Sequence, residues 1–159
     1  MNNEQGKRAE EIFGVRITQN YIFRARDLGD KWPVSDYYVE INDDEEPFYF
    51  IVQVKSSRRG YDTNDNLKIA VTRKKVSQLA NYYAPTYLAG VDIDDEVVYL
   101  TPIYKKKRTG VSKIATNFFL TALDKPTSLQ NLKKLKREIK RFWKETDTKG
   151  IRKKFKSDI

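Results

Sequence analysis

The sequence predicts an α/β protein in which a mixed β-sheet is flanked by helices. Residues 36–55 alternate between apolar and polar side chains in two runs separated by an acidic turn, which is typical of a β-hairpin. A strand, a helix and two more strands are expected over residues 67–103, and residues 128–145 carry apolar side chains at helical spacing. Because such elements must bury their apolar sides against one another, we expect one layered α/β domain.

The predicted hairpin gathers polar side chains on one face of the sheet. Side chains two residues apart on a strand share a face. In the first strand, positions 37, 39 and 41 are apolar, which leaves Asp36 and Glu40 on the opposite face. In the second strand, positions 50, 52 and 54 are apolar, which leaves Gln53 and Lys55 there. The hairpin therefore brings Asp36, Gln53 and Lys55 together, with Glu40 as a further candidate.

The other predicted elements are short, apart from a long basic helix near the C-terminus. The first helix is expected over residues 3–13, and Thr72 is expected to cap a helix over residues 73–83. The C-terminal helix buries a Leu, Ile and aromatic stripe and exposes lysines and arginines. Residues 15–26 are predicted to form a strand or a helix end that leads into one. Strands are predicted over residues 67–71, 87–93 and 97–103, and a strand or buried segment over residues 116–123.

Glu10 borders the apolar face of the first predicted helix, whereas Glu11 points nearly away from it. This position makes Glu10 the better candidate for a functional acid. The alternative stays open, because both acids would also be favoured as solvated groups near the positive end of the helix dipole.

The composition is strongly basic. Lysine and arginine number 31 against 22 aspartates and glutamates, which gives a net charge of +9. Such an excess favours a polyanionic partner, and we expect nucleic acid instead of a membrane because no surface helix with a Trp and Leu face is evident. Cysteine and histidine are absent. Their absence excludes a Cys/His zinc site and a Ser-His or Cys-His nucleophile.

A chain of 159 residues is most economically a single domain. The first residues are polar, and no apolar run approaches the ~20 residues of a membrane span. We therefore expect a cytoplasmic protein. Its expected parts are a core over residues 1–125, a helix packed on the same domain over residues 126–147, and a basic, loosely ordered tail over residues 148–159.

The hairpin residues resemble the motif of the PD-(D/E)XK nuclease superfamily. In that motif an acid opens one strand, and an acid or amide, any residue and a lysine follow on the next; here these are Asp36 and Gln53-Val54-Lys55. The likeness is closest to a small prokaryotic domain-of-unknown-function branch with G-x-x-A-E near the start and V-Q-V-K-S in the hairpin. This chain matches those two patterns at residues 6–10 and 52–56, and the likeness extends to about residue 103.

The resemblance implies a restriction-endonuclease-like core that hydrolyses phosphodiester bonds in DNA with Mg²⁺ or Mn²⁺. It makes Asp36 the central metal ligand, with Gln53 supplying an amide oxygen and Glu10 or Glu40 adding charge. Lys55 would position the attacking water or stabilise the pentavalent phosphorus. Such a set is chemically reasonable, because Mg²⁺ takes only one or two carboxylates from a protein and keeps several waters.

Phosphate contacts are expected from cations that follow predicted strands. Arg58 and Arg59 come directly after the motif, and guanidinium groups match phosphate oxygens well. A second set lies after residue 103 and consists of Lys105, Lys106, Lys107 and Arg108. In the alternative interpretation all of these cations are solvated loop charges.

Two other functions stay open. The chain could be a non-catalytic nucleic-acid-binding module with a degenerate nuclease fold, in which only the basic surface matters. In a structural interpretation, Asp36 and Glu40 form ordinary cross-strand polar pairs with Gln53 and Lys55. Under the nuclease hypothesis we expect DNA instead of RNA as the partner, and a homodimer would supply the two active sites that two-strand cutting calls for.

Overall fold

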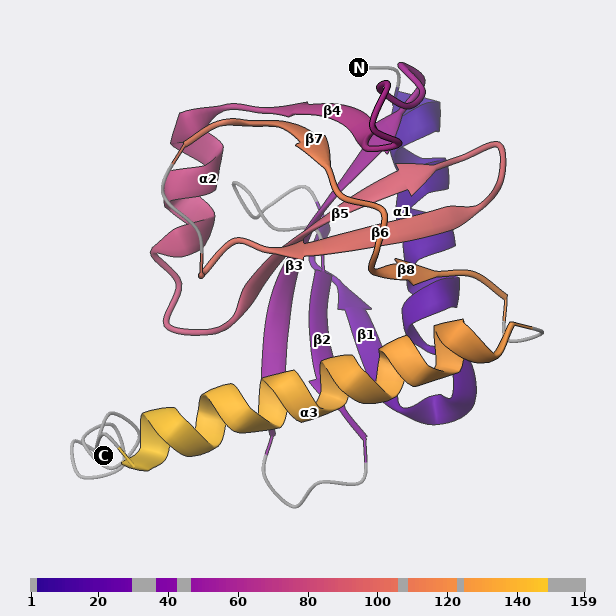
Figure 1. Ribbon diagram of the computed structural model, residues 1–159. Coiled ribbons are helices and arrows are strands. Elements are labelled where there is room, and N and C mark those ends of the chain that lie inside the picture. Colours follow the sequence, from indigo (N-terminus) through magenta and orange to yellow (C-terminus); the bar gives the residue numbers. More distant parts are fainter. Residues whose placement is uncertain (1–2, 30–36, 43–46, 106–108, 123–124, 149–159) are drawn as a thin grey trace.

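A computed structural model describes residues 3–29, 37–42, 47–105, 109–122 and 125–148. Its elements follow one another along the chain as Figure 1 shows. They are α1 (Asn3–Ile17), the 3-10 helix η1 (Gln19–Tyr21), β1 (Phe23–Asp27), β2 (Tyr37–Ile41), β3 (Tyr49–Ser57), β4 (Leu67–Val71), α2 (Arg73–Ala80), β5 (Thr86–Asp92), β6 (Val97–Pro102), β7 (Val111–Ile114), β8 (Phe119–Leu120) and α3 (Pro126–Thr148).

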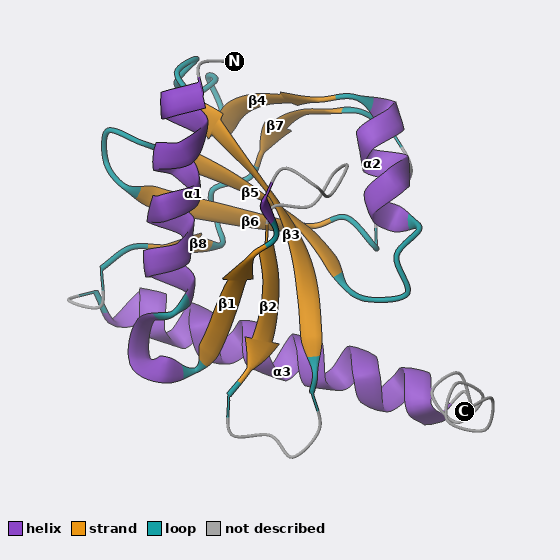
Figure 2. Cartoon of the chain, turned by 180° about the vertical axis from the view of Figure 1, so that it is seen from behind, coloured by secondary structure: helices purple, strands orange, loops and turns teal. Residues whose placement is uncertain are grey.

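The main sheet has six strands in the order β1-β2-β3-β5-β6-β8. The neighbours β3 and β5 run parallel, and the other neighbouring pairs are antiparallel. The sheet is curled, and α1 stands beside it while α3 lies across the ends of β1, β2 and β3 (Figure 2). The predicted α/β class with a mixed sheet is therefore confirmed.

Two apolar cores lie on the two faces of this sheet. Tyr87 and Ala89 of β5 belong to the larger core, together with the buried faces of α1 and α3. Leu88, which alternates with them and so points to the other face, belongs to the smaller core with α2, β4 and β7. Helix α1 therefore covers one face of the sheet, and α2 with the β4–β7 pair covers part of the other.

Helix α1 is longer than the sequence predicted. It continues past residue 13 to Ile17, whose side chain is fully buried. The Thr18 hydroxyl donates to the backbone oxygen of Gly14 at 2.7 Å, and Asn20 and Tyr21 then adopt positive φ angles of 59° and 55°. Because a left-handed residue cannot continue a right-handed helix, the chain turns here and enters β1.

Thr72 caps α2 as predicted, since its hydroxyl accepts a hydrogen bond from the backbone nitrogen of Lys75 at 3.3 Å. The helix ends at Ala80, close to the predicted bound. Strand β7 was not predicted. Ile114 is the only buried residue of β7. The strand is held in place by its pairing with β4, which is distant in the sequence.

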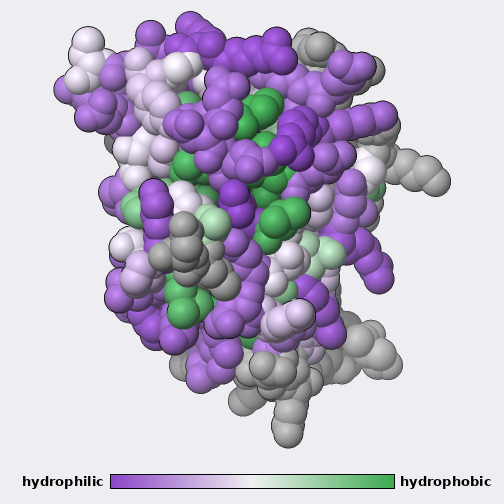
Figure 3. Space-filling view, turned by 90° about the vertical axis from the view of Figure 1, so that its right-hand side faces the viewer, coloured by the Kyte–Doolittle hydropathy of each residue, from purple (hydrophilic) through white to green (hydrophobic). Residues whose placement is uncertain are grey.

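Helix α3 packs into the larger of the two cores, together with α1. Leu132, Leu135 and Ile139 are buried there, and the Trp143 indole donates to the backbone oxygen of Tyr49 at 2.8 Å. The side of the molecule that carries α1 is mainly hydrophilic, with hydrophobic residues visible in its middle (Figure 3). None of the helices in the described ranges combines the length and apolar character that a membrane span needs.

Gly90 allows the β4–β7 layer to approach the sheet closely. A Cβ atom at this position would lie 2.9 Å from Cγ2 of Ile114 and 3.0 Å from Cδ2 of Leu67, and both of these side chains are buried. We expect Gly90→Ala to lower the free energy of unfolding by about 1–3 kcal/mol, because the added methyl overpacks a closed core. Denaturant unfolding measures this effect.

The matched control for Gly90→Ala is Ala70→Val, which adds volume at an exposed position of β4. We expect the control to change stability by less than about 0.5 kcal/mol. Equal stability of wild type and Gly90→Ala would mean that Ile114 and Leu67 do not pack on Gly90 in solution.

Candidate active site

Strand β3 continues beyond the end of its pairing with β2. The β2–β3 register ends at Tyr37 opposite Val52, whereas the parallel pairing with β5 continues to Ser57 opposite Asp92. No strand in the described ranges pairs with residues 53–57 on the side of β3 that faces β2. This edge of β3 is where the motif residues Gln53 and Lys55 lie.

Gln53 and Lys55 share one face of the sheet, as predicted. In the register with β5, Gln53 lies opposite Leu88 and Lys55 lies opposite Gly90, on the face that also carries the smaller core. Gln53 is 7% exposed, and Lys55 is half-buried. Lys55 therefore lies beside Gly90, which has no side chain, on the face of the sheet that the layer of β4 and β7 covers.

Asp36 lies outside the described residues, as do Lys106, Lys107 and Arg108. Tyr37, which follows Asp36 in the sequence, pairs with Val52, the residue before Gln53. The Asp36 assignment therefore stays a prediction from the sequence.

Glu10 lies on α1, which is anchored to the hairpin at two points. The Tyr37 hydroxyl donates to the backbone oxygen of Glu10 at 3.0 Å, and the Gln5 amide donates to the Ser56 hydroxyl at 2.8 Å. Because α1 packs on the opposite face of the sheet from Gln53, the half-buried Glu10 could join Gln53 only around the edge of β3 that β2 leaves open.

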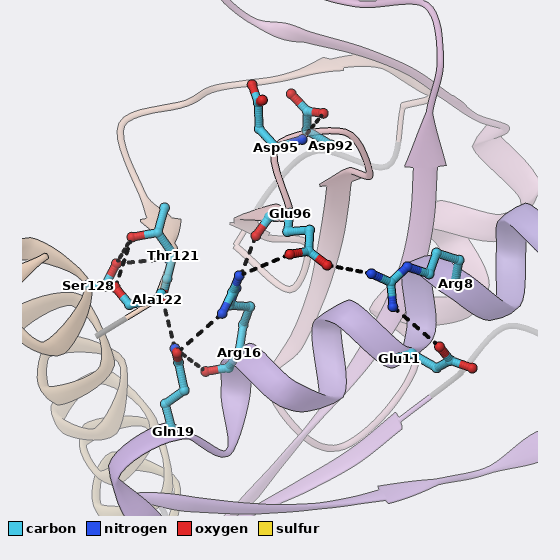
Figure 4. Close-up of polar contacts among 10 residues, drawn as sticks. All are labelled: Arg8, Glu11, Arg16, Gln19, Asp92, Asp95, Glu96, Thr121, Ala122 and Ser128. Carbon is cyan, nitrogen blue, oxygen red and sulfur yellow. Dashed lines mark hydrogen bonds and ion pairs between the residues drawn. The ribbon is translucent and has the colours of Figure 1, made fainter. Parts of the chain in front are cut away.

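A third anchor fixes the far side of α1 (Figure 4). Arg8 and Arg16 both contact Glu96 in the turn between β5 and β6. Arg8 forms an ion pair with the Glu96 carboxylate at 2.5 Å, and Arg16 Nε donates a hydrogen bond to the Glu96 backbone oxygen at 3.0 Å. Gln19, just after the helix, donates to the backbone oxygen of Thr121 at 2.9 Å. These contacts hold α1, and with it Glu10, in a fixed position along the sheet.

Glu40 is not brought to Gln53. It lies opposite Tyr49, four residues before Gln53 on β3, which is a distance of roughly 13 Å along the strand. Its carboxylate is engaged by Arg24 in an ion pair and accepts a hydrogen bond from the Tyr38 hydroxyl at 3.0 Å. Alternation correctly gave the face of Glu40, but Glu40 cannot share an ion with Gln53.

Tyr38 belongs to the polar cluster around Glu40 and was not among the predicted site residues. The pKa of Tyr38 is raised to about 12, mainly by burial and secondly by the hydrogen bond to Glu40. The phenol therefore stays protonated at neutral pH. The cleft here has a volume of about 450 Å³ and is also lined by Arg24, Arg26 and Ile51. Arg24 and Arg26 alternate with Phe23 and Ala25 on edge strand β1, which is the sequence signal that marks this cleft.

Arg58 and Arg59 are exposed just beyond the end of β3. The loop that follows is held by hydrogen bonds. The Tyr61 hydroxyl donates to Asp92 at 2.6 Å, and Asp62 accepts from the backbone nitrogens of Asn64 and Asn66 at 2.8 and 3.0 Å. The two hydrogen bonds to Asp62 lower its pKa, and the one from Asn66 has the largest effect.

Lys105 is the described member of the second predicted basic set. Its ammonium group contacts the Glu138 carboxylate of α3 at 2.7 Å, and this hydrogen bond raises the pKa of Lys105. Lys105 is therefore partly neutralised by a residue 33 positions away. The sequence gave no signal for this pairing, because it depends on how α3 docks.

The described residues contain no group of three or more acidic side chains that could hold a metal ion. The donors that the sequence motif offers are all oxygen atoms, namely the Gln53 amide and the Asp36 and Glu10 carboxylates, which suits a hard cation such as Mg²⁺. A site built on them would require Asp36, whose placement the structure does not describe.

Comparison of the chain with protein-family models, with curated proteins and with solved structures finds no match.

Proposed function

We propose that this protein is a metal-dependent endonuclease that hydrolyses phosphodiester bonds in DNA. The observation that carries the proposal is that Gln53 and Lys55 share one face of β3 in the stretch that extends past β2. There a substrate phosphate could approach the two side chains from an edge that no described strand covers.

The order of the elements supports the same proposal. The chain runs α1, then the antiparallel strands β1, β2 and β3, then β4 of the small second sheet, then α2, and then β5 parallel to β3. The two helices lie on opposite faces of the sheet. Apart from β4, which lies outside the main sheet, a helix, three strands, a helix and a strand follow one another, as in the restriction-endonuclease-like core that the sequence resemblance implies.

In the proposed site, Asp36 and the Gln53 amide oxygen would hold Mg²⁺ or Mn²⁺, and Glu10 would add negative charge at the edge of β3 that no described strand covers. A bound ion would neutralise charge on the phosphate and would lower the pKa of water in its shell. The Lys55 ammonium stabilises the negative charge that develops on the phosphate oxygens. Its half-buried position strengthens this effect, because charges interact more strongly away from bulk water.

A non-catalytic nucleic-acid-binding module is the second candidate function. The observation that favours it is the amide at position 53, because an amide carries one negative charge fewer than a carboxylate and holds a cation less firmly. In that case the basic surface alone would carry the function.

The test is incubation of the purified protein with supercoiled, linear and single-stranded DNA and with RNA, in Mg²⁺, in Mn²⁺ and in EDTA. We expect DNA to be cut in either metal and left intact in EDTA. A protein that shifts DNA on a gel but never cuts it would overturn the nuclease proposal in favour of the binding module.

A further inference from the structure

The outward face of α3 is covered by cations over about three turns. Its buried residues, Leu132, Leu135, Ile139 and Trp143, all lie on the opposite side of the helix. From the first to the last cation this face is roughly 16 Å long, over which one strand of DNA carries about five phosphates. The exposed cations of this face are Lys133, Lys134, Arg137, Arg141 and Lys144, and the half-buried Lys136 and Lys140 flank it.

This face is unfavourable for the helix itself. Lys133 and Arg137, like Arg137 and Arg141, are separated by four residues, and like charges at this spacing destabilise a helix. Within the described part of the chain, Lys133, Lys134 and Arg137 form no ion pair, and all three are exposed. A bound polyanion would remove this repulsion.

A groove runs along one side of the basic face. It has a volume of about 760 Å³ and lies between α3 and the chain that follows β6. Lys134, Arg137 and Arg141 line it from α3, and Tyr104 and Lys105 line it from the other side. Its two acids, Glu138 and Glu145, are each already paired, with Lys105 at 2.7 Å and with Arg141 at 3.0 Å. Among the described residues, Lys134 and Arg137 of the groove therefore remain without an ion-pair partner.

The charge could in principle attract either a nucleic acid or an anionic membrane. Membrane-surface helices combine a basic face with an apolar face that enters the lipid. The apolar residues of α3 are instead buried in the core of the protein, where Trp143 also donates to the Tyr49 backbone. None of the described residues of α3 is an exposed large apolar side chain that could enter lipid, and a polynucleotide backbone is the partner that fits.

We infer that the outward face and groove of α3 form a surface that binds the phosphate backbone of a polynucleotide. Lys133, Lys134 and Arg137 contact phosphates directly, and the groove wall at Tyr104 and Lys105 borders the bound strand. This surface deepens the proposed function by naming an element that holds the substrate, yet binding at α3 does not depend on whether Gln53 and Lys55 support cleavage.

The experiment compares two triple variants that remove the same charge. In the first, Lys133, Lys134 and Arg137 are changed to Gln; in the control, Arg73, Lys74 and Lys75 of α2 are changed to Gln. Binding of fluorescent single-stranded and duplex DNA is measured by anisotropy in EDTA, from about 50 to about 200 mM salt. Thermal unfolding of both variants shows that they are folded, and the α3 variant should be at least as stable as wild type because repulsion is relieved.

The quantity compared is the steepness with which the logarithm of the DNA association constant falls as the logarithm of the salt concentration rises. On duplex DNA we expect the α3 variant to reduce this steepness by about 0.9 per lost phosphate contact, or roughly 2 to 3 in all. The control should stay near wild type. Equal slopes for the two variants would overturn the inference. Tighter binding to phosphatidylserine vesicles than to DNA, lost in the α3 variant, would overturn it in favour of a membrane. If wild type fails to cut DNA but the slopes differ as expected, the nuclease proposal fails and this inference stands.

Discussion

Lys55→Ala should lower the rate of metal-dependent DNA cleavage by roughly 10²–10³-fold, as the loss of one positioned charge-stabilising group does in other enzymes. The residue lies on the face of β3 that also carries Gln53, opposite Gly90. The affinity for DNA should stay within about twofold, since the basic face of α3 carries most of the phosphate contacts in this account. Single-turnover cleavage rates and anisotropy in EDTA separate the two quantities.

The control for Lys55→Ala is Lys68→Ala. Lys68 is also a half-buried lysine on a strand, but it lies on β4 in the small second sheet. We expect its removal to leave the cleavage rate near that of wild type. Cleavage that survives Lys55→Ala unchanged would exclude Lys55 from the active site, and an equal loss in both variants would mean that the effect is one of stability or net charge.

Phe13→Ala should give the largest loss of stability, about 3–5 kcal/mol, because it empties a fully buried aromatic position. The Phe13 ring packs against Tyr37 with ring centroids 5.0 Å apart, and the Tyr37 hydroxyl bonds to the backbone of Glu10. Loss of the ring therefore loosens α1 from the hairpin that carries the motif. Denaturant unfolding followed by circular dichroism measures the change.

Val15→Ala is the matched control on the same helix. Val15 is 60% exposed, so its truncation leaves no cavity and should change stability by less than about 0.5 kcal/mol. If Phe13→Ala cost less than about 1 kcal/mol, α1 would not be packed on β2 and β3 as described, and the position of Glu10 would lose its support.

The hairpin was predictable because its signal is local. Alternation of period two fixes which side chains share a face, and it correctly separated Gln53 and Lys55 from the buried Val52 and Val54. The cap of α2 at Thr72 was predictable for the same reason, since a cap depends on neighbouring residues alone.

Long-range pairing could not be predicted from such local signals. Alternation gives the face of Glu40 but not its partner, and the register of the hairpin places it opposite Tyr49, far from Gln53. Strand β7 was missed because its pairing with β4 joins segments distant in the sequence. The ion pair of Lys105 with Glu138 has the same origin, because it forms only when α3 docks on the sheet.

The most direct test of the central claim is a calorimetric titration of Mn²⁺ into wild type, Gln53→Glu and Asp36→Asn. We predict saturable one-to-one binding by wild type, roughly tenfold tighter binding when Gln53→Glu restores a carboxylate, and loss of binding in Asp36→Asn. If all three proteins bind Mn²⁺ equally, or if none binds it, the face of β3 that carries Gln53 and Lys55 is not a metal site and the nuclease proposal is contradicted.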